Sequence, residues 1–323
     1  MRINWTEIKN ELQTVLPAEK VRENCSMAEY SSFRCGGNAA LLAEPGNEEQ
    51  LFYTLKLLRE AGAEYMILGN GSNVLFSDKG YGGAVVHIGA GLDAVSFETL
   101  TGEAVDPYAD GVKLPYFLRV TAGAGAKLAQ TAKLAASLSY SGMEFASGIP
   151  GSVGGGLFMN AGAYGGELKD IVGSARSVDR DGNLIVRDVE DMDLSYRHSV
   201  YMENGETILS VSFELPYGDK SAIDEKIAEL TEKRTTKQPV NFPSAGSFFK
   251  RPEGYFAGKL IEDSGLKGLQ IGGAQVSELH AGFLINTGGA TATDVIDLMH
   301  VIRETVMDKY GVLLEPEVRI IGE

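Results

Sequence analysis

Two glycine-rich segments carry the residue types that could bind a phosphate group through the main chain. GNGSN, at 69–73, follows the short apolar run EYMIL at 64–68, and GIPGSVGGGLFMNAGAYGG, at 148–166, holds eight glycines in nineteen residues. Consecutive backbone N–H groups in tight glycine turns form anion-binding nests. The candidate cofactor-binding residues are Gly69, Asn70, Gly71, Ser72, Asn73, Gly148, Ile149, Pro150, Gly151, Ser152, Gly155, Asn160, Gly162 and Ala163.

The spacing of these glycines excludes the two commonest nucleotide motifs. Val74 stands where a dinucleotide fingerprint needs its third glycine after Gly69 and Gly71, and no GxxxxGK[ST] segment exists. GNGSN taken alone could be no more than a tight turn. Two nests on separate segments, with Gly154, Gly155 and Gly156 clearing side chains from one surface, suit a pyrophosphate joined to a broad flat ring. This pattern indicates a dinucleotide such as FAD, bound without a Rossmann fold.

Other reactive residue types give weaker signals. Ser247 and Lys250 satisfy the SxxK pattern of serine acyl-transferases, but the SDN and KTG partners of that pattern are absent. The four histidines are scattered without an HExxH pair, so no metal site is predicted. Cys35, next to Arg34, could be a reactive thiol, although a buried apolar cysteine is the simpler interpretation.

Charge and cysteine content narrow the functional class. The chain has 323 residues with 29 basic and 44 acidic side chains, a net charge of −15, which argues against binding to nucleic acid or to anionic membranes. Two cysteines form no disulfide framework, and no run of about 18 apolar residues exists, so we expect a cytoplasmic protein without membrane insertion. Residues 233–267 nevertheless carry a local excess of basic groups.

Local patterns predict the elements that would position these residues. Helices are expected at 4–16, from Asn47 to Gly62, and at 126–139, 220–236 and 291–309. Strands are expected at 64–68, 84–88, 93–98, 114–123, 207–215, 281–285 and 316–321, and Asp181-Gly182 predicts a hairpin between 171–179 and 184–188. Boundaries near 88 and 220 divide the chain into segments 1–88, 89–220 and 221–323.

Several motifs together resemble one enzyme family. FRCGGNA (33–39), LGNGSNVL (68–75), the 148–168 segment, SYRHS (195–199), FPSAGSFFKRP (242–252), GGAQVSELHAGFLIN (272–286) and LEPEVRIIG (314–322) occur in family order. The chain is thereby identified as resembling the UDP-N-acetylenolpyruvoylglucosamine reductases (MurB). The spacing of 50 positions from Arg197 to Ser247 resembles that of the shorter, type II branch.

The resemblance implies an α+β fold. A two-part FAD-binding domain of the vanillyl-alcohol-oxidase (VAO/PCMH) type, 1–88 and 89–220, would precede a C-terminal α+β substrate-binding domain, 221–323. It also implies non-covalent FAD, NADPH as co-substrate, and reduction of the enolpyruvyl ether of a UDP-sugar in peptidoglycan precursor synthesis. Hydride would go from FAD to C3 and a proton to C2.

The resemblance also assigns roles to single residues. Arg197 would clamp the substrate carboxylate, Ser247 would be the general acid, and Glu317 would act at the substrate, while Arg319 would touch FAD. Without the resemblance, Arg197 would be interpreted as a surface arginine, Ser247 as a turn hydroxyl and Glu317 as a strand-edge carboxylate. The predicted substrate-binding residues are Lys250, Arg251, Tyr255 and Lys259.

One residue departs from the family pattern, and two alternative functions stay open. Leu279 stands where the family often has lysine, which puts any contact from that lysine in doubt. A related FAD-dependent oxidase or reductase would keep the cofactor and change the chemistry. A non-catalytic flavin- or nucleotide-binding module would keep only the binding. NADPH turnover that depends on the sugar nucleotide separates these alternatives.

Overall fold

A computed structural model describes residues 3–100 and 117–322 and divides the chain into two compact units. Unit 1 comprises Met1–Glu44, Leu57–Val86 and Lys233–Glu323, and unit 2 comprises Pro45–Lys56 and His87–Glu232. Two boundaries between the units fall inside helices α2 (Glu48–Glu60) and α5 (Lys220–Lys237). The other two lie between Glu44 and Pro45 and between Val86 and His87, at the end of strand β5 (Tyr81–His87). The division of the chain into three segments stays a prediction.

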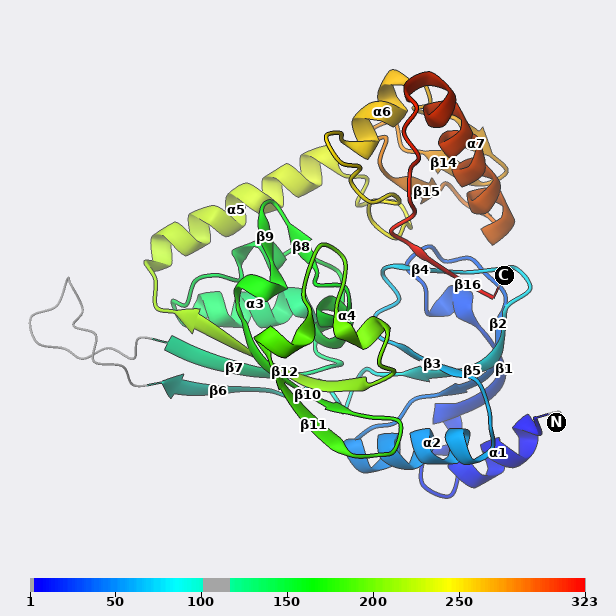
Figure 1. Cartoon of the computed structure of the whole chain (residues 1–323), viewed down its shortest axis with the longest axis vertical. Helices are drawn as coiled ribbons and strands as arrows, with labels where there is room; N and C mark the ends of the chain where they lie inside the picture. Colours follow the sequence, from blue (N-terminus) through cyan, green and yellow to red (C-terminus); the bar gives the residue numbers. More distant parts are fainter. Residues whose placement is uncertain (1–2, 101–116, 323) are drawn as a thin grey trace, which may run out of the picture. The chain divides into compact units, whose positions relative to one another are not determined.

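Unit 1 contains a four-stranded sheet in the order β1-β2-β5-β3, near helix α1 (Figure 1). Its elements are α1 (Trp5–Leu12), β1 (Val21–Ser26), β2 (Asn38–Ala43), β3 (Tyr65–Leu68) and β5 (Tyr81–His87). β1 runs antiparallel to β2, and β2 runs parallel to β5. Since β3 leads into residues 69–73, this sheet positions the first glycine loop.

The C-terminal part of unit 1 packs around one long helix. Its elements are α6 (Ala257–Asp263), β13 (Gln270–Ile271), β14 (Ala274–Val276), β15 (Leu284–Asn286), α7 (Ala292–Tyr310) and β16 (Arg319–Ile321). β16 pairs in parallel with β4 (Val74–Phe76), which directly follows the glycine loop. This pairing brings the end of the chain to the segment that follows residues 69–73.

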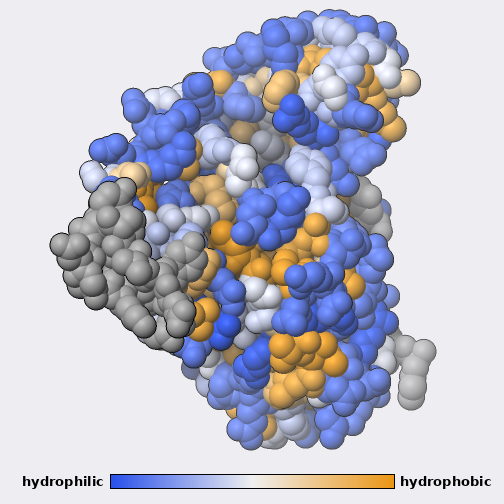
Figure 2. Space-filling view, turned by 60° about the vertical axis from the view of Figure 1, so that its left-hand side comes forward, coloured by the Kyte–Doolittle hydropathy of each residue, from blue (hydrophilic) through white to orange (hydrophobic). Residues whose placement is uncertain are grey.

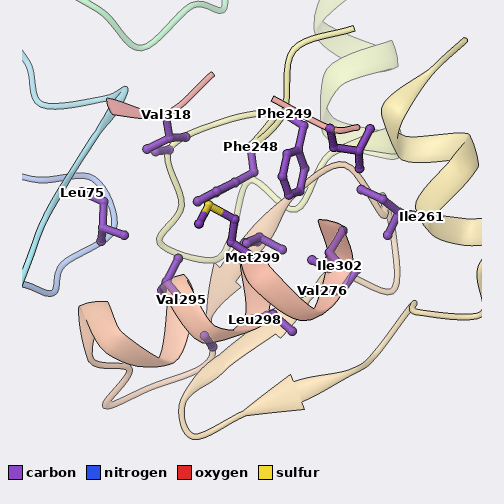
Figure 3. Close-up of a cluster of buried hydrophobic side chains, with 14 of the residues drawn as sticks. Leu75, Phe248, Phe249, Ile261, Val276, Val295, Leu298, Met299, Ile302 and Val318 are labelled. Carbon is purple, nitrogen blue, oxygen red and sulfur yellow. The ribbon is translucent and has the colours of Figure 1, made fainter. Parts of the chain in front are cut away.

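A hydrophobic core holds these C-terminal elements together. Figure 3 shows Phe248 and Phe249 packed among Val295, Met299 and Ile302 of α7, with further labelled core residues around them. The Phe248 and Phe249 rings meet edge to face, 5.3 Å between centres. Fully burying a phenylalanine contributes about 1.5–3 kcal/mol. Ser247 and Lys250 flank this pair in the sequence, so burial of the two rings also fixes the main chain at Ser247 and Lys250.

Unit 2 is built on a five-stranded antiparallel sheet in the order β11-β10-β12-β7-β6. The strands are β6 (Val95–Leu100), β7 (Phe117–Gly123), β10 (Val172–Val178), β11 (Leu184–Asp188) and β12 (Thr207–Pro216). Helix α3 (Leu128–Ser137) and the short helix α4 (Val153–Phe158) belong to the same unit, and α4 packs on β12 and β7 (Figure 1). Two short strands follow α4, and β8 (Gly162–Ala163) pairs antiparallel with β9 (Gly166–Glu167).

Most of the elements expected from the sequence are present, and their ends shift by a few residues. The predicted α+β class is confirmed. The first helix ends at Leu12 rather than 16, and the part of the predicted 114–123 strand at 114–116 lies outside the described residues. β1 and β2 were not expected. The last strand begins at Arg319, so Glu317 lies in the extended segment before β16 and not in the strand.

The face shown in Figure 2 is mainly hydrophilic. Figure 2 shows hydrophilic side chains over most of one face, with smaller hydrophobic patches between them. In residues 3–100 and 117–322, no helix is long and apolar enough to cross a membrane. The same residues contain no group of three or more His, Cys, Asp or Glu side chains that could hold a metal ion.

Candidate active site

The glycine loop 69–73 in unit 1 is held so tightly that its central residue has no room for a side chain. Gly71 adopts φ +61°, and a Cβ added there would lie 1.8 Å from the carbonyl oxygen of Tyr30. The Ser32 N–H donates to the Gly71 carbonyl over 3.0 Å. A positive φ together with a contact this close admits only glycine. The missing side chain of Gly71 therefore serves the packing of this loop against Tyr30, and the anion-binding role of the loop stays a prediction.

The end of this loop is bonded to the segment that carries the predicted glutamate. The Asn73 side-chain amide donates to the Glu317 carbonyl over 3.1 Å, and the Arg319 N–H donates to the Asn73 carbonyl over 3.1 Å. Glu317 is half-buried, and Val318 between the two bonds is buried. Three residues that the sequence assigned to cofactor and substrate thus meet within unit 1.

Ser247 lies on the same network and faces outward. Gly246 before it has φ +79°, and Phe248 after it is fully buried. The Phe248 N–H donates to the Gly282 carbonyl over 2.8 Å, and its carbonyl accepts from the Glu317 N–H over 2.8 Å. The Ser247 side chain is exposed, and its hydroxyl has no hydrogen-bond partner among residues 3–100 and 117–322. It is free to donate a proton to a bound ligand.

The predicted substrate-binding cations of unit 1 already have protein partners. Lys250 pairs with Glu315 at 3.5 Å, and Lys259 pairs with Asp263 one helical turn away. The hydrogen bond and charge of Asp263 raise the pKa of Lys259. Exposed pairs of this kind contribute little to stability.

Arg251 lies against an aromatic ring, a contact that the sequence analysis did not predict. Its guanidinium lies 4.0 Å from the ring centre of Phe256, a residue that is 62% exposed. Tyr255 beside it is also exposed. A cation held over an aromatic face is restricted in direction without losing its charge. The signal in the sequence was the RPEGYF segment, in which Gly254 at φ +74° turns the chain back on itself.

In unit 2, the glycines at 154 and 156 are explained by packing and not by a ligand. A Cβ at Gly154 would lie 2.7 Å from the Ala124 Cβ, and one at Gly156 would lie 3.2 Å from Leu128 and Leu168. The expectation that this whole trio clears a ligand surface is therefore wrong for two of its members. Their missing side chains let α4 approach the neighbouring elements.

Gly155 differs from its neighbours. An added Cβ would meet only the Ser152 hydroxyl, at 3.1 Å, and that hydroxyl accepts from the Gly155 N–H over 3.2 Å. Bare main chain therefore faces away from the packed side of α4. Gly155 is exposed, so α4 offers bare main chain to solvent at this position.

The SYRHS segment is fixed to the glycine-rich stretch by its neighbours in unit 2. Asn160 is buried, and its amide donates to the Ser195 carbonyl over 2.9 Å and to Glu167 over 2.8 Å. The Asn160 side-chain oxygen accepts from the Lys169 N–H over 2.9 Å. The Ser199 hydroxyl donates to the Phe158 carbonyl over 2.7 Å. The amide of Asn160, a predicted cofactor residue, is therefore occupied in holding this loop.

Arg197 projects from this loop in a restrained conformation. Its backbone has φ +55°, its guanidinium donates to the Gly162 carbonyl over 3.3 Å and lies 5.0 Å from the Tyr196 ring centre. A non-glycine residue with positive φ is uncommon and persists only where its surroundings hold it. Unit 2 thus brings Arg197 together with Asn160 and Gly162, and unit 1 brings together Asn73, Ser247 and Glu317.

Several titratable groups near these segments are structural. His280 Nδ1 accepts from the Gly282 N–H over 3.0 Å, and burial lowers its pKa. Burial raises the pKa of Cys35 to about 12, so it is a neutral thiol as the simpler interpretation expected. Desolvation also lowers the pKa of the Arg319 guanidinium, although the residue as a whole is exposed. Arginine nevertheless remains charged in proteins.

The comparisons first define the class of protein. A family model for an FAD-binding domain matches residues 39–187, and a model for the C-terminal domain of UDP-N-acetylenolpyruvoylglucosamine reductase matches residues 238–321. The two matches fall in the order that the sequence predicted. They place the chain among FAD-dependent oxidoreductases, and they confirm the prediction of FAD as cofactor.

Whole-chain relatives then define the family. A UDP-N-acetylenolpyruvoylglucosamine reductase of Clostridium novyi is 44% identical over 98% of this chain and 97% of its own length. One of Agathobacter rectalis is 46% identical over 99% of this chain and its full length. The crystal structure of the Thermus caldophilus enzyme (MurB) superposes with a TM-score of 0.75 at 30% identity, covering 94% of this chain and 100% of that one. The chain belongs to the UDP-N-acetylenolpyruvoylglucosamine reductase family.

Proposed function

We propose that the protein reduces the enolpyruvyl ether of UDP-N-acetylenolpyruvoylglucosamine to a lactyl ether, giving UDP-N-acetylmuramate, with NADPH as the electron source. Its family membership supports this reaction over the acyl transfer that the SxxK pattern allows. FAD, held by the glycine segments, would supply hydride-transfer chemistry between NADPH and C3 of the substrate. The chain's own residues must then bind the substrate, stabilise charge and supply a proton to C2.

The glycine segments are the proposed flavin site. Residues 69–73 would contribute main-chain N–H groups and the Ser72 hydroxyl, and the candidate residues of 148–163 would contribute bare main chain around Gly155. The support is the match of residues 39–187 to an FAD-binding domain and, in the second segment, the exposed main chain at Gly155. Arg319, which follows the Glu317 segment, is proposed to lie near the cofactor.

Arg197 is the proposed clamp for the substrate carboxylate. Hydride addition at C3 leaves negative charge at C2 that is shared with this carboxylate. A guanidinium can bind both carboxylate oxygens at once, and fixed donors at a developing negative charge are often the largest single contribution to catalysis. The held conformation of Arg197 supports this role, because its guanidinium is already restrained by Gly162 and Tyr196.

Ser247 is the proposed proton donor to C2, with Glu317 acting beside it at the substrate. The observation that carries this proposal is the exposed Ser247 hydroxyl without a partner among the described residues, one peptide from a main chain bonded to Glu317. A serine is a weak acid, but it suffices for a carbanion, which is a strong base. Lys250, Arg251, Tyr255 and Lys259 are proposed to hold the diphosphate and the base.

Two spectroscopic steps test the reaction. The purified protein should show flavin absorption bands that bleach under NADPH without oxygen and return when the enolpyruvyl sugar nucleotide is added. Return of the bands only with oxygen would instead indicate the oxidase alternative. A protein that binds no FAD, or bands that do not return with this substrate, would contradict the proposed function.

The Ser247→Ala variant tests the proton donor. We expect bound FAD and its reduction by NADPH to be unchanged, and oxidation by substrate to slow by about 10²–10⁴-fold, the usual contribution of a general acid. Ser244→Ala, a serine in the same segment, is the matched control and should behave as the wild type. Equal rates for wild type and Ser247→Ala in stopped-flow oxidation would reject the assignment.

We also propose that the protein acts in the cytoplasm. Cys25 and Cys35 are both free and buried. Unpaired thiols are usual where glutathione and thioredoxin keep cysteines reduced. This supports the cytoplasm as the place of action, and detection of the protein in a cytosolic fraction after cell disruption would test it.

A further inference from the structure

Asn73 bonds to the main chain on both sides of Val318. Its carbonyl accepts from the Arg319 N–H, and its side-chain amide donates to the Glu317 carbonyl, each over 3.1 Å. The first contact continues the parallel pairing of β4 with β16. The second contact needs a side-chain donor of the right length, so only the second depends on the residue being asparagine.

The Glu317 main chain is bonded on its other side as well. The Glu317 N–H donates to the Phe248 carbonyl over 2.8 Å, and the Lys250 N–H donates to the Glu315 carbonyl over 2.8 Å. Phe248 and Val318 are both in the core drawn in Figure 3. The segment 315–319 is therefore fixed between two partners, the Ser247–Lys250 segment and Asn73 at the end of the glycine loop.

We propose that Asn73 is a positioning residue for catalysis, which fixes the Glu317 carboxyl relative to Ser247 and to the glycine loop. This inference rests on the proposed function, because it needs Glu317 and Ser247 to act in the oxidation of the reduced protein by substrate. In this proposal, the Asn73 side chain positions Glu317 and does not contact FAD. The proposed role concerns only the Asn73 side chain and leaves its main-chain N–H as part of the glycine loop.

The physical reason is that Glu317 precedes strand β16 and its carbonyl accepts a hydrogen bond from the Asn73 amide. Without the amide of Asn73, this carbonyl loses a hydrogen bond that only a side chain supplies. The peptide can then rotate, and the carboxyl moves with it. A displacement of about 1 Å in a catalytic group can reduce a rate by about 10²-fold. We expect the oxidation step to slow by roughly 10- to 100-fold.

The test uses two substitutions of Asn73 in the full-length holoprotein. Asn73→Asp keeps the shape but replaces the donor with an oxygen that repels the Glu317 carbonyl, and Asn73→Ala removes the donor. Both should slow the oxidation of NADPH-reduced protein by UDP-N-acetylenolpyruvoylglucosamine. The rate of FAD reduction by NADPH and the FAD dissociation constant, measured by flavin fluorescence, should change by less than about threefold. Asn10→Asp, at an exposed position on α1, adds the same charge as the control and should match the wild type in all measurements.

Each outcome supports or overturns the inference. A selective loss in the oxidation step, with normal FAD affinity, supports positioning of Glu317. Weaker FAD binding and slower reduction by NADPH in both variants would show that the side chain serves the cofactor and would overturn the inference. A lower melting temperature with both half-reactions unchanged would show a purely structural role and would overturn it too.

Failure of the inference can be told apart from failure of the proposed function. The wild-type protein is measured first with the same substrate. If substrate does not oxidise the reduced wild type, the proposed function itself is wrong. If substrate oxidises the wild type and both Asn73 variants equally fast, only the positioning role is wrong.

Discussion

Replacing Asp78 with alanine should measure how much one distant carboxylate stabilises helix α7. Asp78 lies in the turn between β4 and β5, and its carboxylate accepts from the Ala292 N–H (2.9 Å), the Thr293 N–H (2.8 Å) and the Thr293 hydroxyl (2.6 Å). These N–H groups lie in the first turn of α7, where no partner exists within the helix. Asp78 is therefore a second cap, added to the local cap made by Thr291.

The size of the effect follows from this geometry. Loss of a side-chain cap costs about 1 kcal/mol, and loss of a negative charge at a helix N-terminus costs about 0.3–1 kcal/mol at an exposed site. Asp78 is exposed and Thr291 remains, so we expect Asp78→Ala to lower the free energy of unfolding by about 1.5 kcal/mol. For a unit of this size, that corresponds to a fall in melting temperature of roughly 3–6 °C.

The effect should depend on pH in a definite direction. Partial burial alone would raise the pKa of Asp78, but the hydrogen bonds from Thr293 and Ala292 outweigh it and lower the pKa. A carboxylate with a lowered pKa in the folded state stabilises the protein above its unfolded pKa of about 3.9. That contribution is lost as the pH falls through the folded value. The difference between wild type and variant should thus be full at pH 7 and shrink below about pH 4.

Thermal and urea unfolding, followed by circular dichroism at the same FAD concentration, would measure this difference at pH 7, 5 and 3. Asp308→Asn removes the same charge near the C-terminal end of α7, where an acidic side chain is unfavourable, so this control should lose no stability. An Asp78→Ala protein as stable as the wild type at pH 7 would refute the cap. So would a loss that stays the same at pH 3.

Three further predictions concern single residues. Arg197→Lys should keep the charge but slow oxidation by substrate at least tenfold, since lysine lacks the planar fork that binds two oxygens; stopped-flow rates equal to the wild type would reject the clamp. Gly71→Ala should destabilise unit 1 by about 3 kcal/mol, because its Cβ would overlap the Tyr30 carbonyl, whereas Gly62→Ala, at φ +63° with open space, should cost only about 1 kcal/mol in denaturant unfolding. Cys35, with its pKa raised to about 12, should resist a thiol reagent at pH 8 until the protein is unfolded.

Elements with local signals could be predicted from the sequence. Asp181-Gly182 located the β10–β11 hairpin, where Gly182 has φ +90°. Asn47 located the start of α2, where its side chain accepts from the Gln50 N–H over 2.9 Å. β1 and β2 could not be found in this way, because β1 is stabilised by pairing with β2, and β2 by pairing with β1 and β5. β2 and β5 are separated along the chain by α2, β3 and β4.

The same limit applies to the candidate site. The motifs indicated which residue types are present, but packing decided what several of them do: Gly154 serves the approach of α4, and Asn160 holds the Ser195 loop. Lys250 and Lys259 are in ion pairs with acidic groups that the sequence analysis did not connect to them. Apart from the pair of Lys259 with Asp263, which has the i,i+4 spacing of a helix, these assignments depend on contacts whose partners have no fixed spacing from the residue concerned.

The link between Asn73 and Glu317 shows why such contacts stay hidden. The two residues are 244 positions apart, and the acceptor is a main-chain carbonyl that every residue type possesses. The Phe248 carbonyl and the Glu317 N–H are also main-chain groups. A motif records side chains, whereas the relative position of Ser247 and Glu317 depends on two main-chain groups and one amide. The sequence can therefore identify the proposed reacting groups, while the residue that aligns them becomes visible only after the chain has folded.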